Sequence, residues 1–145
     1  MRTSQVGWKK GFTLVELAVV VVIIGVLAAF GVPRFMDAVE RSKASESFSY
    51  LASVRAAQER YHARQGTYAE KIKDLDVRFA TPRYFTVGTI QAGSTGDLQD
   101  SWTLTLTRLG ASAGYGPYAV TFTHEGYDGE NSTIDEKPAI NPMQT

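Results

Sequence analysis

The sequence predicts an α+β fold, in which one long N-terminal α-helix packs on a small antiparallel β-sheet of three to four strands. Residues 12–32 form an apolar run, and residues 34–65 continue it with apolar positions three and four residues apart. Residues 83–90, 102–109 and 118–124 show the alternation that is typical of strands with one buried face. The 145 residues therefore hold one small domain joined to a helical appendage.

Charge is unevenly distributed, although the formal net charge is zero. Residues 1–11 carry three basic side chains and no acidic one, whereas residues 84–145 carry two basic and seven acidic side chains. An acidic distal half disfavours direct nucleic-acid binding, because contacts to phosphates need Lys and Arg. The chain has no cysteine, which excludes disulfides and thiol chemistry.

The apolar run is long enough to cross a membrane. From residue 12 to Pro33 it gives about 33 Å of helix, against a bilayer core of about 30 Å. The basic residues precede it, so the positive-inside rule places the N-terminus in the cytoplasm. Glu16 lies inside the run, where a carboxylate costs about 2–3 kcal/mol near the bilayer centre and less toward the interface. Because the chain keeps this costly carboxylate inside the apolar run, we expect Glu16 to have a function.

Three interpretations of this segment compete. A secretory signal peptide cut near residues 28–29 would need a polar cleavage region, but the run continues directly into a helical pattern. A plain membrane anchor explains the length and the flanking charge, but it gives no role to Glu16 or to the junction between Gly11 and Phe12. The third interpretation treats that junction and Glu16 as functional.

Residues 9–35, KKGFTLVELAVVVVIIGVLAAFGVPRF, resemble the N-terminus of type IV prepilins and of type II secretion pseudopilins. Residues 57–69, AQERYHARQGTYA, are similar to pilin sequence at the end of the helix. The resemblance implies the pilin fold and retention of the apolar helix. It implies that a prepilin peptidase cuts between Gly11 and Phe12 and N-methylates Phe12. Glu16 then pairs with the Phe12 amine of a neighbouring subunit and serves as an assembly signal.

The resemblance also implies a division of the chain. Residues 1–11 are a cleaved basic leader, residues 12–33 the transmembrane and filament-core half of the helix, and residues 34–66 its amphipathic half. Residues 67–145 form a globular head with a connector, the sheet and a C-terminal loop. The implied partners are the lipid bilayer before assembly, the peptidase, an inner-membrane assembly platform and further copies in a helical filament. The implied locations are the bacterial inner membrane and then an extracellular pilus or a periplasmic pseudopilus.

Pro33 removes one backbone donor and predicts a kink rather than an end of the helix, because the helical pattern resumes at once. The amphipathic half predicts one apolar stripe along its buried face. Its members are Phe35, Val39, Ala44, Phe48, Leu51, Ala52, Val54 and Tyr61. The expected polar face carries Asp37, Glu40, Arg41, Lys43, Glu46, Glu59 and Arg60.

The acidic tail from residue 125 onward is predicted to be loop. Asp128 and Asp135 are weak candidates for calcium ligands, but the spacing is not that of an EF-hand, and an acidic surface loop is the simpler interpretation. Many type IV pilins close this loop with a disulfide, so here packing or an ion must hold it. His62 is interpreted as a solvated helix residue rather than a metal ligand. No cofactor is expected.

The sequence contains no nucleophile motif, phosphate-binding glycine loop or metal triad. We therefore expect a structural subunit of a type IV pilus that serves motility, adhesion or DNA uptake, and not an enzyme. The alternatives left open are a pseudopilin of type II secretion and a minor pilin whose head adheres or takes up DNA. A membrane-anchored enzyme is a more remote alternative.

Overall fold

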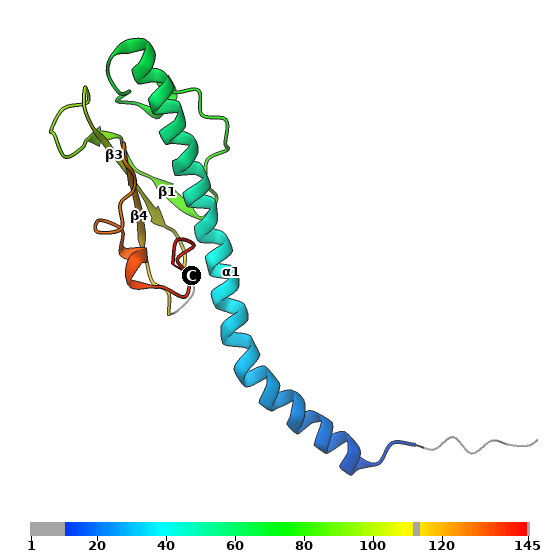
Figure 1. Cartoon of the computed structure of the whole chain (residues 1–145). Helices are drawn as coiled ribbons and strands as arrows, with labels where there is room; N and C mark the ends of the chain where they lie inside the picture. Colours follow the sequence, from blue (N-terminus) through cyan, green and yellow to red (C-terminus); the bar gives the residue numbers. More distant parts are fainter. Residues whose placement is uncertain (1–10, 112–113, 145) are drawn as a thin grey trace, which may run out of the picture. The chain divides into compact units, whose positions relative to one another are not determined.

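The computed structural model describes residues 11–111 and 114–144. The chain divides into two compact units, Met1–Met36 and Asp37–Thr145, and each is described by itself. The predicted leader, residues 1–11, lies outside the described residues except for Gly11. One α-helix, α1 (Leu14–Gln65), belongs to both units (Figure 1).

In the first unit, α1 exposes its apolar side chains. An 18-residue window reaches a mean hydropathy of 2.8 with none of it buried, which makes the helix long and apolar enough to cross a membrane. Leu14 is 89% exposed and Phe30 is 73% exposed. The helix runs through Pro33 and does not end at Val32. The kink at Pro33 stays a prediction.

In the second unit, α1 packs against the sheet through one stripe. Ala44, Phe48, Leu51, Val54 and Ala57 are buried at intervals of three and four residues, as an amphipathic helix requires. Three predicted members of the stripe were wrong, because Phe35 and Val39 precede the buried stretch and Ala52 lies on the opposite face; all three are exposed. One predicted polar-face residue was also wrong, because Glu40 continues the buried stripe and is 2% exposed.

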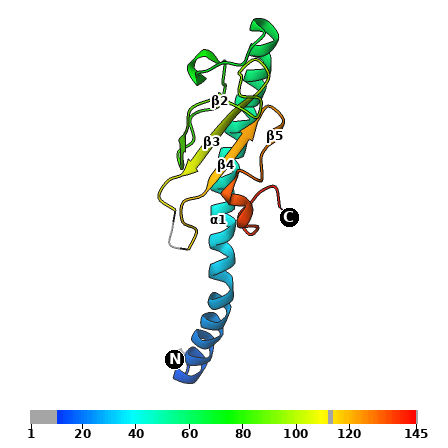
Figure 2. The same ribbon diagram turned by 90° about the vertical axis from the view of Figure 1, so that its left-hand side faces the viewer.

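Within residues 11–111 and 114–144, the sheet is antiparallel and has five strands. Figure 2 shows the sheet in front of α1. The strands are β1 (Phe85–Val87), β2 (Gln91–Ala92), β3 (Trp102–Arg108), β4 (Ala119–Thr123) and β5 (Gly126–Tyr127). The order is β1-β3-β4-β5, and β2 pairs with the other end of β3. The α+β prediction is confirmed.

The first predicted strand, residues 83–90, contains only the short β1, because the chain leaves the ladder at Gly88. The Gly88 N–H donates to the Thr105 carbonyl at 3.0 Å. A Cβ on Gly88 would lie 2.7 Å from that oxygen, so the close approach of the two backbones requires glycine.

The inner face of the sheet forms the core with the helix stripe. Trp102, Leu104 and Leu106 are buried, as the alternation predicts, and Leu104 lies opposite Phe122 on β4. The Phe122 ring meets the Phe48 ring of α1 edge to face, with centroids 5.9 Å apart. Each large apolar side chain buried in this way contributes about 1.5–3 kcal/mol.

The connector after α1 is tied to the helix by a buried amide. Gln58 donates from Nε2 to the Ala69 carbonyl at 2.9 Å and accepts from the Ala69 N–H at 2.8 Å. His62, predicted to be solvated, stacks on Tyr68 and lies 2.9 Å from the Gln99 carbonyl through Nε2. A short 3₁₀ helix, η1 (Ile72–Asp74), follows in the connector.

The tail is not all loop, contrary to the prediction. It contains β5 and a 3₁₀ helix, η2 (Thr133–Glu136), and it buries Ile134 and Ile140 almost completely. Two isolated isoleucines in an acidic, polar segment give no periodicity, so the pattern could not show their burial.

The tail also covers one edge of the sheet. The Ser132 hydroxyl accepts from the Thr121 N–H, and the Thr133 hydroxyl accepts from the Ala119 N–H, each at 2.8 Å. The Asp128 N–H donates to the Thr121 carbonyl at 3.0 Å. Backbone groups of β4 beyond its pairing with β5 are thereby satisfied by the tail.

Candidate functional site

The junction between Gly11 and Phe12 precedes the first turn of α1. Phe12 is 78% exposed, and a Cβ built on Gly11 meets no described atom within 4 Å. The described part of the chain therefore does not cover this peptide bond, as a cleavage site for another enzyme requires.

Thr13 and Glu16 form a capping box at the start of α1. The Glu16 Oε2 atom accepts from the Thr13 N–H at 2.9 Å and from the Thr13 hydroxyl at 2.7 Å. The Thr13 hydroxyl accepts in turn from the Glu16 N–H at 3.2 Å. Two backbone donors at the helix start are satisfied reciprocally, which is the defining pattern of this motif.

Sequence reasoning did not identify this motif, although Thr-x-x-Glu before an apolar run is its signal. The capping box gives Glu16 a local role in addition to the predicted role in assembly. It also reduces the cost of keeping a carboxylate in an apolar segment, because the charge accepts hydrogen bonds. The structure brings Gly11, Phe12 and Glu16 to the beginning of α1, whereas Pro33 lies several turns further along the same helix.

A second polar cluster, which the sequence did not predict, lies inside the second unit. Arg108 at the end of β3 donates to both carboxylate oxygens of Glu40, from Nε to Oε1 at 2.6 Å and from Nη2 to Oε2 at 3.0 Å. The Tyr118 hydroxyl donates to Oε1 at 2.9 Å. We call Glu40, Arg108 and Tyr118 the Glu40 cluster; all three are at most 4% exposed.

Neighbouring contacts satisfy the rest of the Glu40 cluster. The remaining Arg108 nitrogen donates to the carbonyls of Tyr84 and Leu109. One turn earlier on α1, Asp37 accepts from the Tyr115 hydroxyl at 2.6 Å. The Arg41 guanidinium donates to the Gln144 carbonyl at 3.1 Å. The beginning of the second unit's helix is therefore attached to β3, to the segment just before β4 and to the tail.

Burial alone would raise the pKa of Glu40, but the hydrogen bonds from Arg108 and Tyr118 and the charges of Arg108 and Lys43 outweigh it, so this pKa lies below its ordinary value. The hydrogen bond to Glu40 raises the pKa of Arg108, although burial opposes it. The hydrogen bond to Asp37 raises the pKa of Tyr115 to about 12. Burial, and then the hydrogen bond to Glu40, raise the pKa of Tyr118, so the Glu40 cluster is an ion pair with a neutral tyrosine at neutral pH.

We expect the head to lose stability in acid because of Glu40. Its folded-state pKa is lower than its unfolded-state pKa, so its contribution is complete above about pH 4.5 and is lost as the pH falls through the folded-state value. Denaturation of the mature chain, followed by the fluorescence of the buried Trp102 at pH 7 and pH 3, measures the loss. Glu40→Gln should reduce this pH dependence. The pH dependence that remains in this variant includes the contribution of Asp76, whose pKa is lowered by its hydrogen bond from Arg60.

The two candidate calcium ligands have separate protein partners. Asp135 accepts through Oδ1 from the side chains of Tyr127, Asn141 and Gln144, at 3.0, 3.0 and 2.6 Å. Asp128 accepts from the N–H and the side-chain amide of Asn131. Within residues 11–111 and 114–144, no three His, Asp or Glu side chains form a group that could hold a metal ion. These contacts do not test the weak candidacy of Asp128 and Asp135 as calcium ligands, and hydrogen bonds hold the C-terminal loop.

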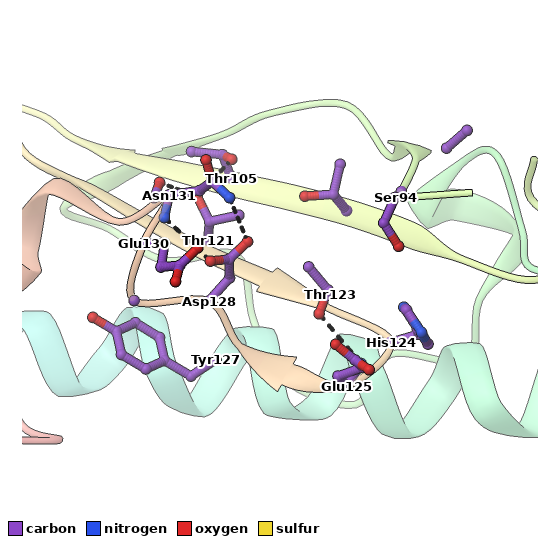
Figure 3. Close-up of a pocket in the computed structure, with 14 residues that line it drawn as sticks. Ser94, Thr105, Thr121, Thr123, His124, Glu125, Tyr127, Asp128, Glu130 and Asn131 are labelled. Atoms are coloured by element: carbon purple, nitrogen blue, oxygen red, sulfur yellow. Dashed lines mark hydrogen bonds between the residues drawn. The ribbon is translucent and has the colours of Figure 1, made fainter. Parts of the chain in front are cut away.

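The outer face of the sheet carries a polar groove of about 850 Å³ between β2 and the loop after β4 (Figure 3). Three of its four threonines, Thr105, Thr121 and Thr123, make hydrogen bonds through their hydroxyl groups within the fold. Thr105 and Thr121 hydrogen-bond to each other at 2.9 Å, and Thr121 also donates to the Asn131 carbonyl. The Thr123 hydroxyl accepts from the Glu125 N–H. These contacts join the strands to the tail and do not form a catalytic arrangement.

Comparison with known proteins agrees with the site at the start of α1. The family model of the prokaryotic N-terminal methylation motif matches residues 9–32, which include Gly11, Phe12 and Glu16. The chain is 39% identical over 94 residues to the type IV narrow pilus major component PilA5 of Thermus thermophilus. This match covers 65% of the chain and 74% of the relative.

Two further relatives extend the similarity. The type IV major pilin protein PilA of Myxococcus xanthus is 29% identical over 158 residues, with 97% of the chain and 71% of the relative covered. The fimbrial protein EcpC of Eikenella corrodens is 42% identical over 60 residues, or 41% of the chain and 39% of the relative. With the motif, the long apolar helix and the antiparallel head in place, the chain belongs to the type IV pilin family.

Proposed function

We propose that this chain is the structural subunit of a type IV pilus filament, and not an enzyme. The observation that carries the function is the apolar half of α1, whose large side chains are exposed along its whole length. Each such side chain gains about 1.5–3 kcal/mol on leaving water, so the segment as a whole favours a bilayer or a filament core by on the order of tens of kcal/mol. The chain is a membrane-anchored precursor that then becomes a filament subunit.

Processing makes the precursor competent for assembly in this proposal. A prepilin peptidase cuts between Gly11 and Phe12 on the cytoplasmic face of the inner membrane, and N-methylates Phe12. Three facts support it: the methylation motif, the exposure of Phe12 and the basic residues that precede the helix. The helix from residue 12 stays with the protein and crosses the inner membrane once.

Assembly then depends on the new amine. Cleavage creates a positive charge on Phe12, and Glu16 supplies a negative charge at the start of the same helix. In a staggered bundle of helices, the Phe12 amine of one copy pairs with Glu16 of the next. An unpaired charge among apolar helices is costly, so a subunit out of register is disfavoured. A helical filament of identical subunits, built by an inner-membrane platform, follows from this pairing.

The intact mass of the protein in the sheared surface fraction of its native host tests the proposal. A mass that begins at Phe12 with one additional methyl group, in an abundant fibre band, is the expected result. Correct processing with the bulk of the protein in the inner membrane would instead indicate a pseudopilin or a minor pilin. A mass that begins at Met1, or after Val32, would contradict the proposed processing.

A further inference from the structure

The two carboxylate oxygens of Glu16 have different surroundings. Oε2 accepts both hydrogen bonds from Thr13, one from the N–H and one from the hydroxyl. Within residues 12–111 and 114–144, no side chain or backbone group donates to Oε1. These residues are the described part of the chain that would remain after cleavage at Gly11.

Thr13 also restricts how the carboxylate can turn. A hydrogen bond to a charged oxygen is stronger than a neutral one, and here two of them meet on a single atom. The third bond, from the Glu16 N–H to the Thr13 hydroxyl, fixes the hydroxyl that makes one of them. Rotation of the Glu16 side chain would break both hydrogen bonds to Oε2, so they give Oε1 a preferred direction relative to the helix.

Cleavage leaves this arrangement intact. The bond that is cut joins Gly11 to Phe12, whereas both Thr13 donors lie on the far side of Phe12. The neighbours of Glu16 on the helix, Val15 and Leu17, are apolar and exposed, so they offer Oε1 no partner of their own. In apolar surroundings, an oxygen without a donor favours a charged donor from another molecule.

We propose that Thr13 is a positioning residue for filament assembly: it holds Oε2 of Glu16 and thereby presents Oε1 to the Phe12 amine of a neighbouring copy. The inference rests on the proposed pairing of Glu16 with that amine and adds the group that orients it. The hydroxyl is the essential part, because the N–H donor is present whatever the side chain is. Serine can replace Thr13 in this role, whereas valine, with nearly the same shape, cannot.

The test compares three variants of the full-length chain in the native host: Thr13→Val, Thr13→Ser and Glu16→Gln. The filament fraction is the amount of subunit in sheared fibres divided by the amount of mature subunit in the membrane, and intact mass confirms cleavage and methylation. Thr13→Val should lower this fraction about tenfold or more, as expected for loss of a hydrogen bond to a charged group. Thr13→Ser should stay within about twofold of the wild type, as serine keeps the hydroxyl. Thr107→Val, at an exposed threonine of β3, is the matched control and should change nothing.

The outcomes distinguish the role of Thr13 from the proposed pairing of Glu16 with the Phe12 amine, on which it rests. Normal filaments from Thr13→Val, together with loss of filaments from Glu16→Gln, would overturn the role of Thr13 and leave the pairing intact. A Thr13→Ser variant as defective as Thr13→Val would overturn the role of the hydroxyl. Uncleaved or unmethylated Thr13→Val would assign Thr13 to processing and overturn the inference. Normal filaments from Glu16→Gln would overturn the pairing itself.

Discussion

Replacing Arg108 with methionine should lower the free energy of unfolding of the head by about 3–5 kcal/mol. The substitution leaves the Glu40 carboxylate at 2% exposure without its cation, and with only the Tyr118 hydroxyl and the more distant Lys43 as partners. Removing one member of a buried ion pair costs more than the pair contributes, because the remaining charge is neither hydrated nor compensated. The expected loss is a large fraction of the 5–15 kcal/mol that is typical of a whole domain.

The fluorescence of Trp102 measures this loss in a denaturant titration of the mature chain in detergent. A chain that begins at Phe12 keeps Trp102, in the core of the head, and lacks Trp8. The matched control is Arg60→Met. Arg60 pairs with Asp76, and both side chains are nearly half exposed, so loss of this ion pair should change the free energy of unfolding little. The double variant Glu40→Leu/Arg108→Met should recover most of the stability. Equal losses of unfolding free energy from Arg108→Met and Arg60→Met would contradict the stabilising role given to the buried pair of Arg108 and Glu40.

Replacing Gly11 with leucine should stop maturation almost completely and with it filament formation. The proposed cut follows Gly11, and the resemblance to prepilins implies that the peptidase tolerates little side chain there. A side chain at Gly11 meets no described atom of the chain, so the substitution does not disturb the fold. Any failure to mature therefore reports on recognition by the peptidase and not on a misfolded precursor.

Intact mass of the membrane fraction measures this effect as the ratio of precursor to mature chain. Gly25→Leu is the matched control, because a Cβ at Gly25 also meets nothing within 4 Å and the residue lies beyond the junction. The control should be cleaved as efficiently as the wild type. Efficient cleavage of Gly11→Leu would place the processing site elsewhere.

The periodic parts of the fold could be predicted because they are local. The helix stripe around Leu51 and the alternation from Trp102 to Leu106 follow from spacing alone, and both are confirmed. The Glu40 cluster could not be predicted in this way, because Glu40 and Arg108 are 68 residues apart and each resembles an ordinary surface charge. The available signal was positional: Arg108 continues the buried side of β3, and Glu40 precedes Ala44 by one helical turn.

The same distinction between local and long-range features applies to the N-terminal site and to the tail. The motif around Gly11, Phe12 and Glu16 was recognised because its residues are adjacent in the chain, and the family comparison agrees with it. The capping contact between Thr13 and Glu16 has an equally local signal, which is Thr-x-x-Glu before an apolar run. The buried isoleucines of the tail have no such signal, since they depend on contacts with the rest of the head.

The cover that Ser132 and Thr133 give to β4 has a consequence for a protein that is crowded against copies of itself. An open strand edge is a template for another strand, and pairing between identical edges leads to aggregation. Hydroxyl side chains satisfy the β4 donors without offering a continuous backbone ladder to a second molecule. Heads held side by side therefore cannot join their sheets along this stretch of β4.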